Sequence, residues 1–234
     1  MPQGLRWGQD GPGVLLLHGF TGVPADLAAF GERLGVSGYS VKAPWLAGHG
    51  DGPVELERVT AYQWRRGAEI ALMELVEEHP RSGVAVLGLS LGGMLAVDLA
   101  ARFPVRALVC VNPAAAVQRK AASVAPYLWR LVPYIKIGPE AEDRLSVHAV
   151  AELVRAMRES AAEAPKVRAP VLVLQSQHDP TVRPEASQRL FERFGSREKE
   201  FAMLPSHEHV PRRDAEDFVQ RIVVFLSRHL EAWL

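Results

Sequence analysis

The chain of 234 residues carries 27 lysine and arginine residues and 27 aspartate and glutamate residues, so its formal net charge at pH 7 is zero. The two signs are also interspersed along the sequence, and no basic cluster favours binding to nucleic acid or to an anionic membrane surface. The length suits one large α/β domain or two small ones, and it is sufficient to bury a sizeable core.

The single cysteine, Cys110, excludes an internal disulfide and a cysteine-rich zinc site. It lies in the apolar run 107–111, which favours a buried thiol over a nucleophile. The amino terminus lacks the charged start and apolar stretch of a secretory signal. The most apolar window, residues 84–97, contains three glycines and a serine and is too short to span a membrane. We therefore expect a cytoplasmic protein without stable membrane insertion.

Apolar runs recur along the chain and alternate with amphipathic patterns. The runs predict strands at residues 14–17, 39–43, 84–89, 106–111, 171–175 and 200–204. Apolar residues spaced three and four apart predict helices at residues 25–35, 61–78, 91–102, 184–194 and 215–230. Because most strand runs are apolar throughout, they suit strands covered on both faces. The alternation predicts an α/β fold with an open, mostly parallel sheet.

Residues 112–167 interrupt this alternation, since they lie between two adjacent strand patterns where a single crossover helix would be sufficient. Two amphipathic helix patterns occur within the insertion. The first passes through Val124, Tyr127, Leu128 and Leu131, and the second through Val150, Leu153, Val154 and Met157. The insertion is either a lid over an active site or an extra layer on the core. We favour the lid, because long insertions in compact domains tend to be functional.

The sharpest chemical motif is Gly88-Leu89-Ser90-Leu91-Gly92, at the junction between a predicted strand and a predicted helix. A G-x-S-x-G motif in this position forms a tight turn that presents the serine at the carboxyl end of the sheet. The two glycines remove side chains that would collide with the neighbouring strand and helix. Ser90 also precedes the amino terminus of a helix, where backbone N–H groups favour a negatively charged oxygen. The motif predicts a nucleophilic serine.

A serine nucleophile needs a histidine base and an acid that orients it. Asp179 follows the strand at 171–175, and the segment Ser206-His207-Glu208-His209 follows the strand at 200–204. We expect Asp179 to be the acid and His209 to be the base, with His207 as the alternative base. An alternative acid would be a carboxylate after the strand at 106–111, but that position holds Asn112-Pro113.

The turn His18-Gly19-Phe20-Thr21-Gly22 follows the first predicted strand. Its glycines allow a close approach to Ser90, so the backbone N–H groups of Phe20 and Leu91 are the expected donors to a tetrahedral oxyanion. We interpret His18 as a side chain that holds the loop and not as a second base. The segment 48–52 contains a histidine and an aspartate, but these are too few ligands for a stable metal site. We expect it to be a loop near the pocket, packed against Trp45.

Together, the segments 18–22 and 48–50, the elbow at 88–93, His178-Asp179 and His209-Val210 resemble the bacterial carboxylesterase and monoacylglycerol lipase branch of the α/β-hydrolase family. The resemblance extends from Gly11 to the end of the chain. It implies one α/β-hydrolase domain over residues 1–234, with residues 112–167 as an inserted helical lid. The chain departs from the family pattern at Ser206-His207-Glu208, where a shorter, glycine-like lead into the catalytic histidine is typical.

The resemblance implies a serine carboxylesterase that hydrolyses small, uncharged carboxyl esters with short to medium acyl chains, including monoacylglycerols, without a cofactor or metal. The alternatives are a thioesterase, an acyltransferase or a C–C bond hydrolase with the same triad, and a non-catalytic binding module on the same fold. The expected acyl-pocket residues are Phe20, Leu89, Tyr127, Leu128 and Leu131.

Overall fold

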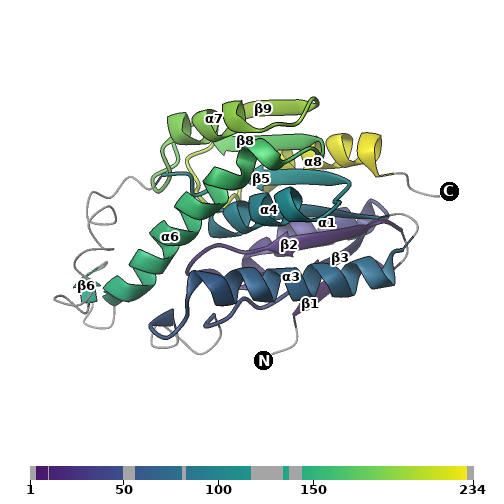
Figure 1. The fold of residues 1–234 in the computed structure, drawn as a ribbon. Helices are drawn as coiled ribbons and strands as arrows, with labels where there is room; N and C mark the ends of the chain where they lie inside the picture. Colours follow the sequence, from purple (N-terminus) through teal and green to yellow (C-terminus); the bar gives the residue numbers. More distant parts are fainter. Residues whose placement is uncertain are drawn as a thin grey trace.

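The structure, a computed structural model, describes residues 4–9, 11–49, 56–80, 83–116, 134–136 and 144–230. Seven strands form one sheet in the order β1-β3-β2-β4-β5-β8-β9 (Figure 1). Within this sheet, only the pairing of β1 with β3 is antiparallel, so the expected mostly parallel sheet is confirmed. The strands are β1 (Leu5–Trp7), β2 (Gly13–Leu17), β3 (Ser40–Ala43), β4 (Val84–Leu89), β5 (Ala107–Val111), β8 (Val171–Ser176) and β9 (Lys199–Leu204).

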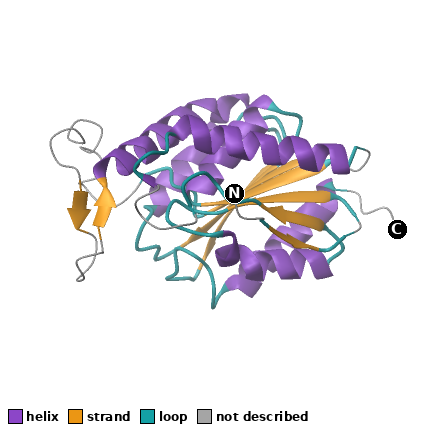
Figure 2. Cartoon of the chain, turned by 90° about the horizontal axis from the view of Figure 1, so that it is seen from below, coloured by secondary structure: helices purple, strands orange, loops and turns teal. Residues whose placement is uncertain are grey.

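Helices cover both faces of this sheet, which lies between two helical layers in Figure 2. The helices on one face are α3 (Ala61–Glu78), α4 (Leu91–Arg102), α6 (Val147–Glu163) and α7 (Pro184–Arg193). Those on the other face are α1 (Ala28–Val36) and α8 (Ala215–His229). Alternate strand residues serve the two layers, because successive side chains of a strand point to opposite faces. Leu15 and Leu17 pack beneath the first layer, and Val14 and Leu16 beneath the second.

Several short elements differ from the expectations. Strand β1 is only three residues long and carries too short a pattern to be recognised in the sequence. The helix expected at 25–35 is divided into the 3-10 helix η1 (Pro24–Leu27) and α1, since Pro24 begins the segment. Within the insertion, β6 (Tyr134–Lys136) and β7 (Arg144–Ser146) form an antiparallel pair, and η2 (Ala164–Lys166) follows α6.

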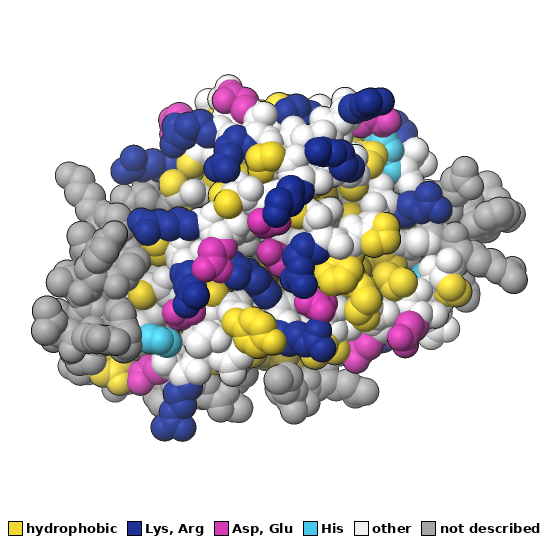
Figure 3. Space-filling view, in the orientation of Figure 1, with side chains coloured by type: hydrophobic (Ala, Val, Ile, Leu, Met, Phe, Trp, Pro, Cys, Tyr) yellow, Lys and Arg dark blue, Asp and Glu magenta, His cyan; other side chains and the backbone are white. Residues whose placement is uncertain are grey.

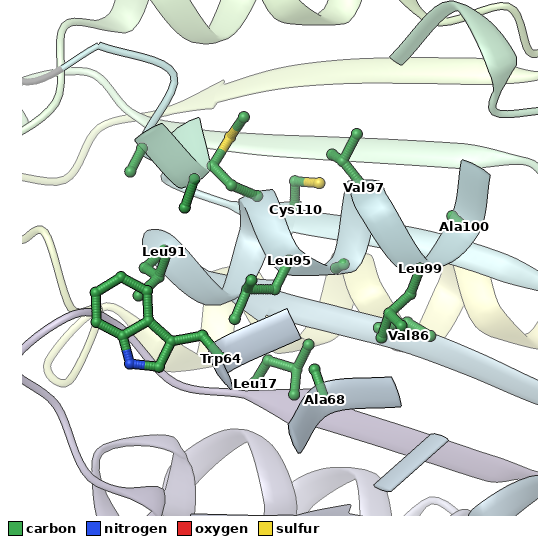
Figure 4. Close-up of a cluster of buried hydrophobic side chains, with 14 of the residues drawn as sticks. Leu17, Trp64, Ala68, Val86, Leu91, Leu95, Val97, Leu99, Ala100 and Cys110 are labelled. Atoms are coloured by element: carbon green, nitrogen blue, oxygen red, sulfur yellow. The ribbon is translucent and has the colours of Figure 1, made fainter. Parts of the chain in front are cut away.

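Strand β4 and helix α4 run through the centre of the larger core cluster, part of which Figure 4 shows. Trp64 from α3, Leu95 from α4 and Cys110 from β5 are each 0% exposed. Burial raises the pKa of the Cys110 thiol, which agrees with the expectation of an unreactive side chain. This core fixes the start of α4, and with it the position of Ser90.

Lysine and arginine side chains lie among acidic ones over the face of the molecule drawn in Figure 3. This mixed surface agrees with the interspersed charges of the sequence. Among the residues that the structure describes, no helix is both long and apolar enough to cross a membrane.

Candidate active site

Ser90 lies in the turn between β4 and α4, with φ 56° and ψ −117°. A Cβ atom on Gly92 would lie 2.0 Å from the Leu17 carbonyl oxygen, and one on Gly88 would lie 2.0 Å from the Gly92 carbonyl oxygen. Both positions therefore require glycine, as the motif predicts. Two hydrogen bonds hold the turn: Ser90 N–H donates to the Val111 carbonyl over 3.0 Å, and Ala114 N–H donates to the Ser90 carbonyl over 3.1 Å.

Asp179 and His209 form a hydrogen-bonded pair in the loops after β8 and β9. Since a carboxylate only accepts, His209 Nδ1 donates to Asp179 Oδ2 over 2.8 Å. The other carboxylate oxygen, Oδ1, accepts the backbone N–H groups of Thr181 and Val182 over 2.7 and 2.9 Å. The Asp179 side chain is 0% exposed and that of His209 is 17% exposed. The acid is therefore enclosed, and it holds the His209 ring through Nδ1.

His207, the alternative base, has a different environment. Its ring stacks on that of His178, with the ring centroids 4.4 Å apart and an interplanar angle of 20°. Both side chains are exposed. Of the two candidate bases, His209 is the one that the structure pairs with Asp179.

The turn after β2 lies against Ser90. A Cβ atom on Gly19 would lie 3.4 Å from Ser90 Cβ and 3.9 Å from Ser90 Oγ, which is van der Waals contact, so the turn directly adjoins the serine side chain. His18 Nδ1 donates to the Gly19 carbonyl over 3.0 Å, and His18 Nε2 accepts Leu46 N–H over 3.2 Å. Burial lowers the pKa of His18 to about 4, which keeps the ring neutral at pH 7. His18 holds the loop, as expected.

A second loop supports the same turn. His49 Nε2 contacts the Phe20 carbonyl oxygen, and His49 Nδ1 lies 2.9 Å from the Ala47 carbonyl oxygen, which also accepts Trp64 Nε1–H over 3.0 Å. Burial lowers the pKa of His49. The segment around His49 thus adjoins the turn, as expected, although the Trp45 ring contacts His18. Residues 50–52 of this segment lie outside the described residues.

The expected acyl-pocket residues have separate locations. Phe20 packs against Val147, Val150, Ala151 and Val154 of α6, and its ring lies edge-on to Trp64 at a centroid distance of 5.7 Å. Leu89 is 1% exposed and packs in the core on the α1 and α8 face of the sheet, because its neighbour Ser90 is the residue that the turn presents. Tyr127, Leu128 and Leu131 lie outside the described residues.

Asn112 and Trp64 are site residues that the sequence analysis missed. Asn112 is 0% exposed, and its side-chain amide bonds the backbone of the loop that carries His209. The sequence feature that indicates it is its position directly after the predicted strand at 106–111, where polar side chains reach the edge of the sheet that carries the site. Among the described residues, no group of three or more histidine, cysteine or acidic side chains has the geometry for a metal ion.

These features together make up a serine at a strand-to-helix elbow and a histidine whose Nδ1 bonds a buried carboxylate. On a mostly parallel sheet flanked by helices, this is the arrangement of an α/β-hydrolase. The chain belongs to the Hydrolase_4 family, described as serine aminopeptidase, S33, whose model matches residues 12–142 and 136–216.

Individual relatives agree with this assignment. The chain is 29% identical to the thermostable monoacylglycerol lipase of Bacillus sp. (strain H-257), over 95% of this chain and 94% of the relative. It is 26% identical to a carboxylesterase of Bacillus subtilis (strain 168), over 92% of each chain. A structure from the study of LipS and LipT, two metagenome-derived lipolytic enzymes, matches with a TM-score of 0.88 and 28% identity, over 97% of this chain and 98% of the other. The protein is a serine hydrolase of the lipase and esterase type.

Proposed function

We propose that the protein hydrolyses carboxyl esters with short to medium acyl chains, including monoacylglycerols, through an acyl-enzyme on Ser90. The observation that carries the proposal is the 2.8 Å bond between His209 and the enclosed Asp179, in the loops beside the Ser90 elbow. The names of the two Bacillus relatives, a monoacylglycerol lipase and a carboxylesterase, support an ester as the substrate.

The first half of the reaction acylates Ser90. His209 Nε2 takes the proton from Ser90 Oγ while Oγ forms a bond to the ester carbonyl carbon. The N–H groups of Phe20 and Leu91 bond the resulting oxyanion, each lowering the barrier by about 3 kcal/mol. Asp179 holds the Nδ1 proton and stabilises the imidazolium. The C–O bond to the alcohol then breaks, and the alcohol leaves with the proton from His209.

The second half of the reaction releases the acid. His209 takes a proton from water as the water oxygen attacks the acyl carbon, and the same two backbone N–H groups bond the second oxyanion. The bond from the acyl carbon to Ser90 Oγ breaks, and Oγ recovers the proton from His209. Every group in these steps is a side chain, a backbone amide or water.

Residues 112–167 act as a lid in this proposal, within a single catalytic domain of residues 1–234. Among the described residues of this segment, helix α6 contributes the apolar side chains beside the site, because Val147, Val150, Ala151 and Val154 pack with Phe20. In this proposal, the apolar contact supplies one wall of the acyl pocket, beside the Phe20 N–H that donates to the oxyanion. An apolar wall favours an uncharged acyl chain over a charged one.

The test is hydrolysis of p-nitrophenyl esters of graded acyl length by the wild-type protein, Ser90→Ala and Ser196→Ala. Ser90 and Ser196 are each 7% exposed, and the Ser196 hydroxyl bonds the nearby Glu198 backbone. S196A therefore controls for the loss of a buried hydroxyl. We expect turnover by the wild type and S196A, and none above background by S90A. Retained turnover in folded S90A would overturn the proposal, and a matched thioester series distinguishes a thioesterase.

A further inference from the structure

Asn112 is the first residue after β5, at the edge of the sheet where the site lies. The order of the strands puts β5 between β4, which leads to Ser90, and β8, which leads to Asp179. Asn112 has φ 43° and is 0% exposed, and its backbone N–H donates to the Leu174 carbonyl of β8 over 2.8 Å. Asn112 therefore lies between the segment that carries Ser90 and the segment that carries Asp179.

Both ends of the Asn112 side-chain amide form hydrogen bonds with neighbouring segments. Oδ1 accepts Ser176 N–H over 2.7 Å, while Nδ2 donates to the His209 carbonyl over 2.8 Å. Nδ2 also lies 3.0 Å from Ser176 Oγ and 3.3 Å from the Glu208 carbonyl oxygen. One end of the amide thus meets an N–H group and the other meets two carbonyl oxygens, so the orientation of the amide is defined.

The backbone on either side of Asn112 is bonded to Ser90. The Val111 carbonyl accepts Ser90 N–H, and Ala114 N–H donates to the Ser90 carbonyl. A continuous path of hydrogen bonds therefore runs from the backbone of the serine, through the segment 111–114, to the backbone of His209. The Asp179 carboxylate bonds the His209 imidazole, whereas the Asn112 amide bonds the backbone carbonyl of His209.

We propose that Asn112 is a positioning residue, which fixes the distance and direction from His209 to Ser90 by bonding the His209 backbone carbonyl. This inference rests on the proposed esterase function. The chemistry at this position also requires an amide in place of the isosteric carboxylate, since an aspartate would direct a negative oxygen at two carbonyl oxygens.

Three substitutions separate the side chain from the backbone. N112A removes the amide and leaves a β-carbon at a positive φ, which alanine tolerates poorly, while N112G removes the amide without that strain. N112D keeps the shape and replaces the donating NH₂ group by an oxygen. S196A serves again as the control for the loss of buried hydrogen bonds outside the site.

We expect kcat to fall about 100-fold in N112G and N112A, with KM close to that of the wild type, because a misplacement of the base by about 1 Å has an effect of this size. N112G should unfold at a higher temperature than N112A and be no more active. In N112D, protonation supplies an O–H donor to the His209 carbonyl. Its kcat relative to that of the wild type should therefore rise as the pH is lowered, whereas the ratio for N112G should not.

A wild-type kcat in folded N112G, or a ratio for N112D that does not change with pH, would overturn the inference. If N112G and N112A do not fold, the isosteric N112D provides the test on its own, through the pH dependence of its kcat relative to that of the wild type. Failure of the ester hydrolase proposal itself has a different signature, namely a wild-type protein that neither hydrolyses esters nor reacts with a fluorophosphonate at Ser90.

Discussion

Ser90 combines a positive φ of 56° with a ψ of −117°, a backbone conformation that a serine seldom adopts. A conformation of this kind costs about 1 to 3 kcal/mol and persists only where its surroundings enforce it. Here, the hydrogen bonds on both sides of the Ser90 backbone and the two flanking glycines enforce it. The strain is localised at the residue whose side chain must be presented to a substrate.

The two histidines after β9 provide a matched pair for testing the base. We expect His209→Asn to lower kcat by about 1,000-fold, because it removes the group that accepts the serine proton. We expect His207→Asn to retain a kcat near that of the wild type, since His207 stacks on His178 instead of bonding Asp179. Steady-state hydrolysis of a p-nitrophenyl ester measures both. A large loss in H207N with little loss in H209N would reverse the assignment.

At this scale, the candidate site residues that the sequence predicts are those marked by a local motif. Ser90 is marked by its glycines, and Asp179 and His209 by their positions after strands. Asn112 was not recognised, because its proposed role depends on contacts with Ser176 and His209, which lie far away in the sequence. Leu89 ends β4, and its side chain packs in the core on the α1 and α8 face of the sheet.

The elbow between β4 and α4 and the helix α6 are the two elements that shape the site. Helix α6 is fixed to α3 at two points: Glu152 accepts the Ala61 N–H at the start of α3 over 2.8 Å, and Glu159 bonds Arg65. The same helix packs its apolar side against Phe20. In the proposed enzyme, a lid built on α6 therefore has a fixed base next to Phe20.

A substitution of Gly92 tests the geometry of the elbow, with a substitution of Gly67 as its control. Gly92→Ala would put a methyl group 2.0 Å from the Leu17 carbonyl oxygen, and we expect it to destabilise the protein by about 1 to 3 kcal/mol and to reduce activity. Gly67→Ala is the control, because Gly67 lies within α3 and nothing is within 4 Å of its added methyl. It should stabilise the protein by about 0.5 to 1 kcal/mol. Urea unfolding measures both, and equal stabilities would contradict this account.

The main elements could be predicted because each has a strong apolar pattern. Six strands and five helices agree in location with their patterns, and α6 includes the expected apolar positions from Val150 to Met157. The short strands β1, β6 and β7 could not be predicted, because three residues carry too little periodicity and their pairing depends on distant partners.

For the whole molecule, the sheet order explains how residues far apart in sequence form one site. The parallel strands β4, β5, β8 and β9 are neighbours in the sheet, so the loops after them emerge at one edge. That order brings Ser90, Asn112, Asp179 and His209 together. The sequence indicates the strands but does not give their order, and for this reason the residue between the nucleophile and the acid was missed.

Two buried histidines beside the site link the stability of the fold to pH. The folded pKa of His18 is about 4, below the usual 6.5, so the unfolded chain binds more protons between these values and stability falls as the pH is lowered. His49 acts in the same direction. Glu78, Glu159 and Glu208 have lowered pKa values, so their contributions are lost mainly below their usual value of 4.5. Of these groups, the histidines therefore account for most of the change in the free energy of unfolding between pH 6.5 and 5.

We expect the free energy of unfolding to fall between pH 6.5 and 5, with His18 contributing about 2 kcal/mol of the loss. His18→Gln should be less stable than the wild type at pH 7 and should lose less stability over this window. Urea unfolding at a series of pH values measures both slopes. Parallel slopes in the two proteins would contradict the assignment of this acid sensitivity to His18.

The central claim is that Ser90 is the nucleophile that becomes acylated, and covalent labelling tests it most directly. After reaction with a fluorophosphonate, mass spectrometry of the intact protein and its peptides should show one adduct per chain, on Ser90. S196A should be labelled like the wild type, and S90A should not be labelled. An adduct on another residue, or an unlabelled Ser90 in a folded protein that hydrolyses esters, would contradict the claim.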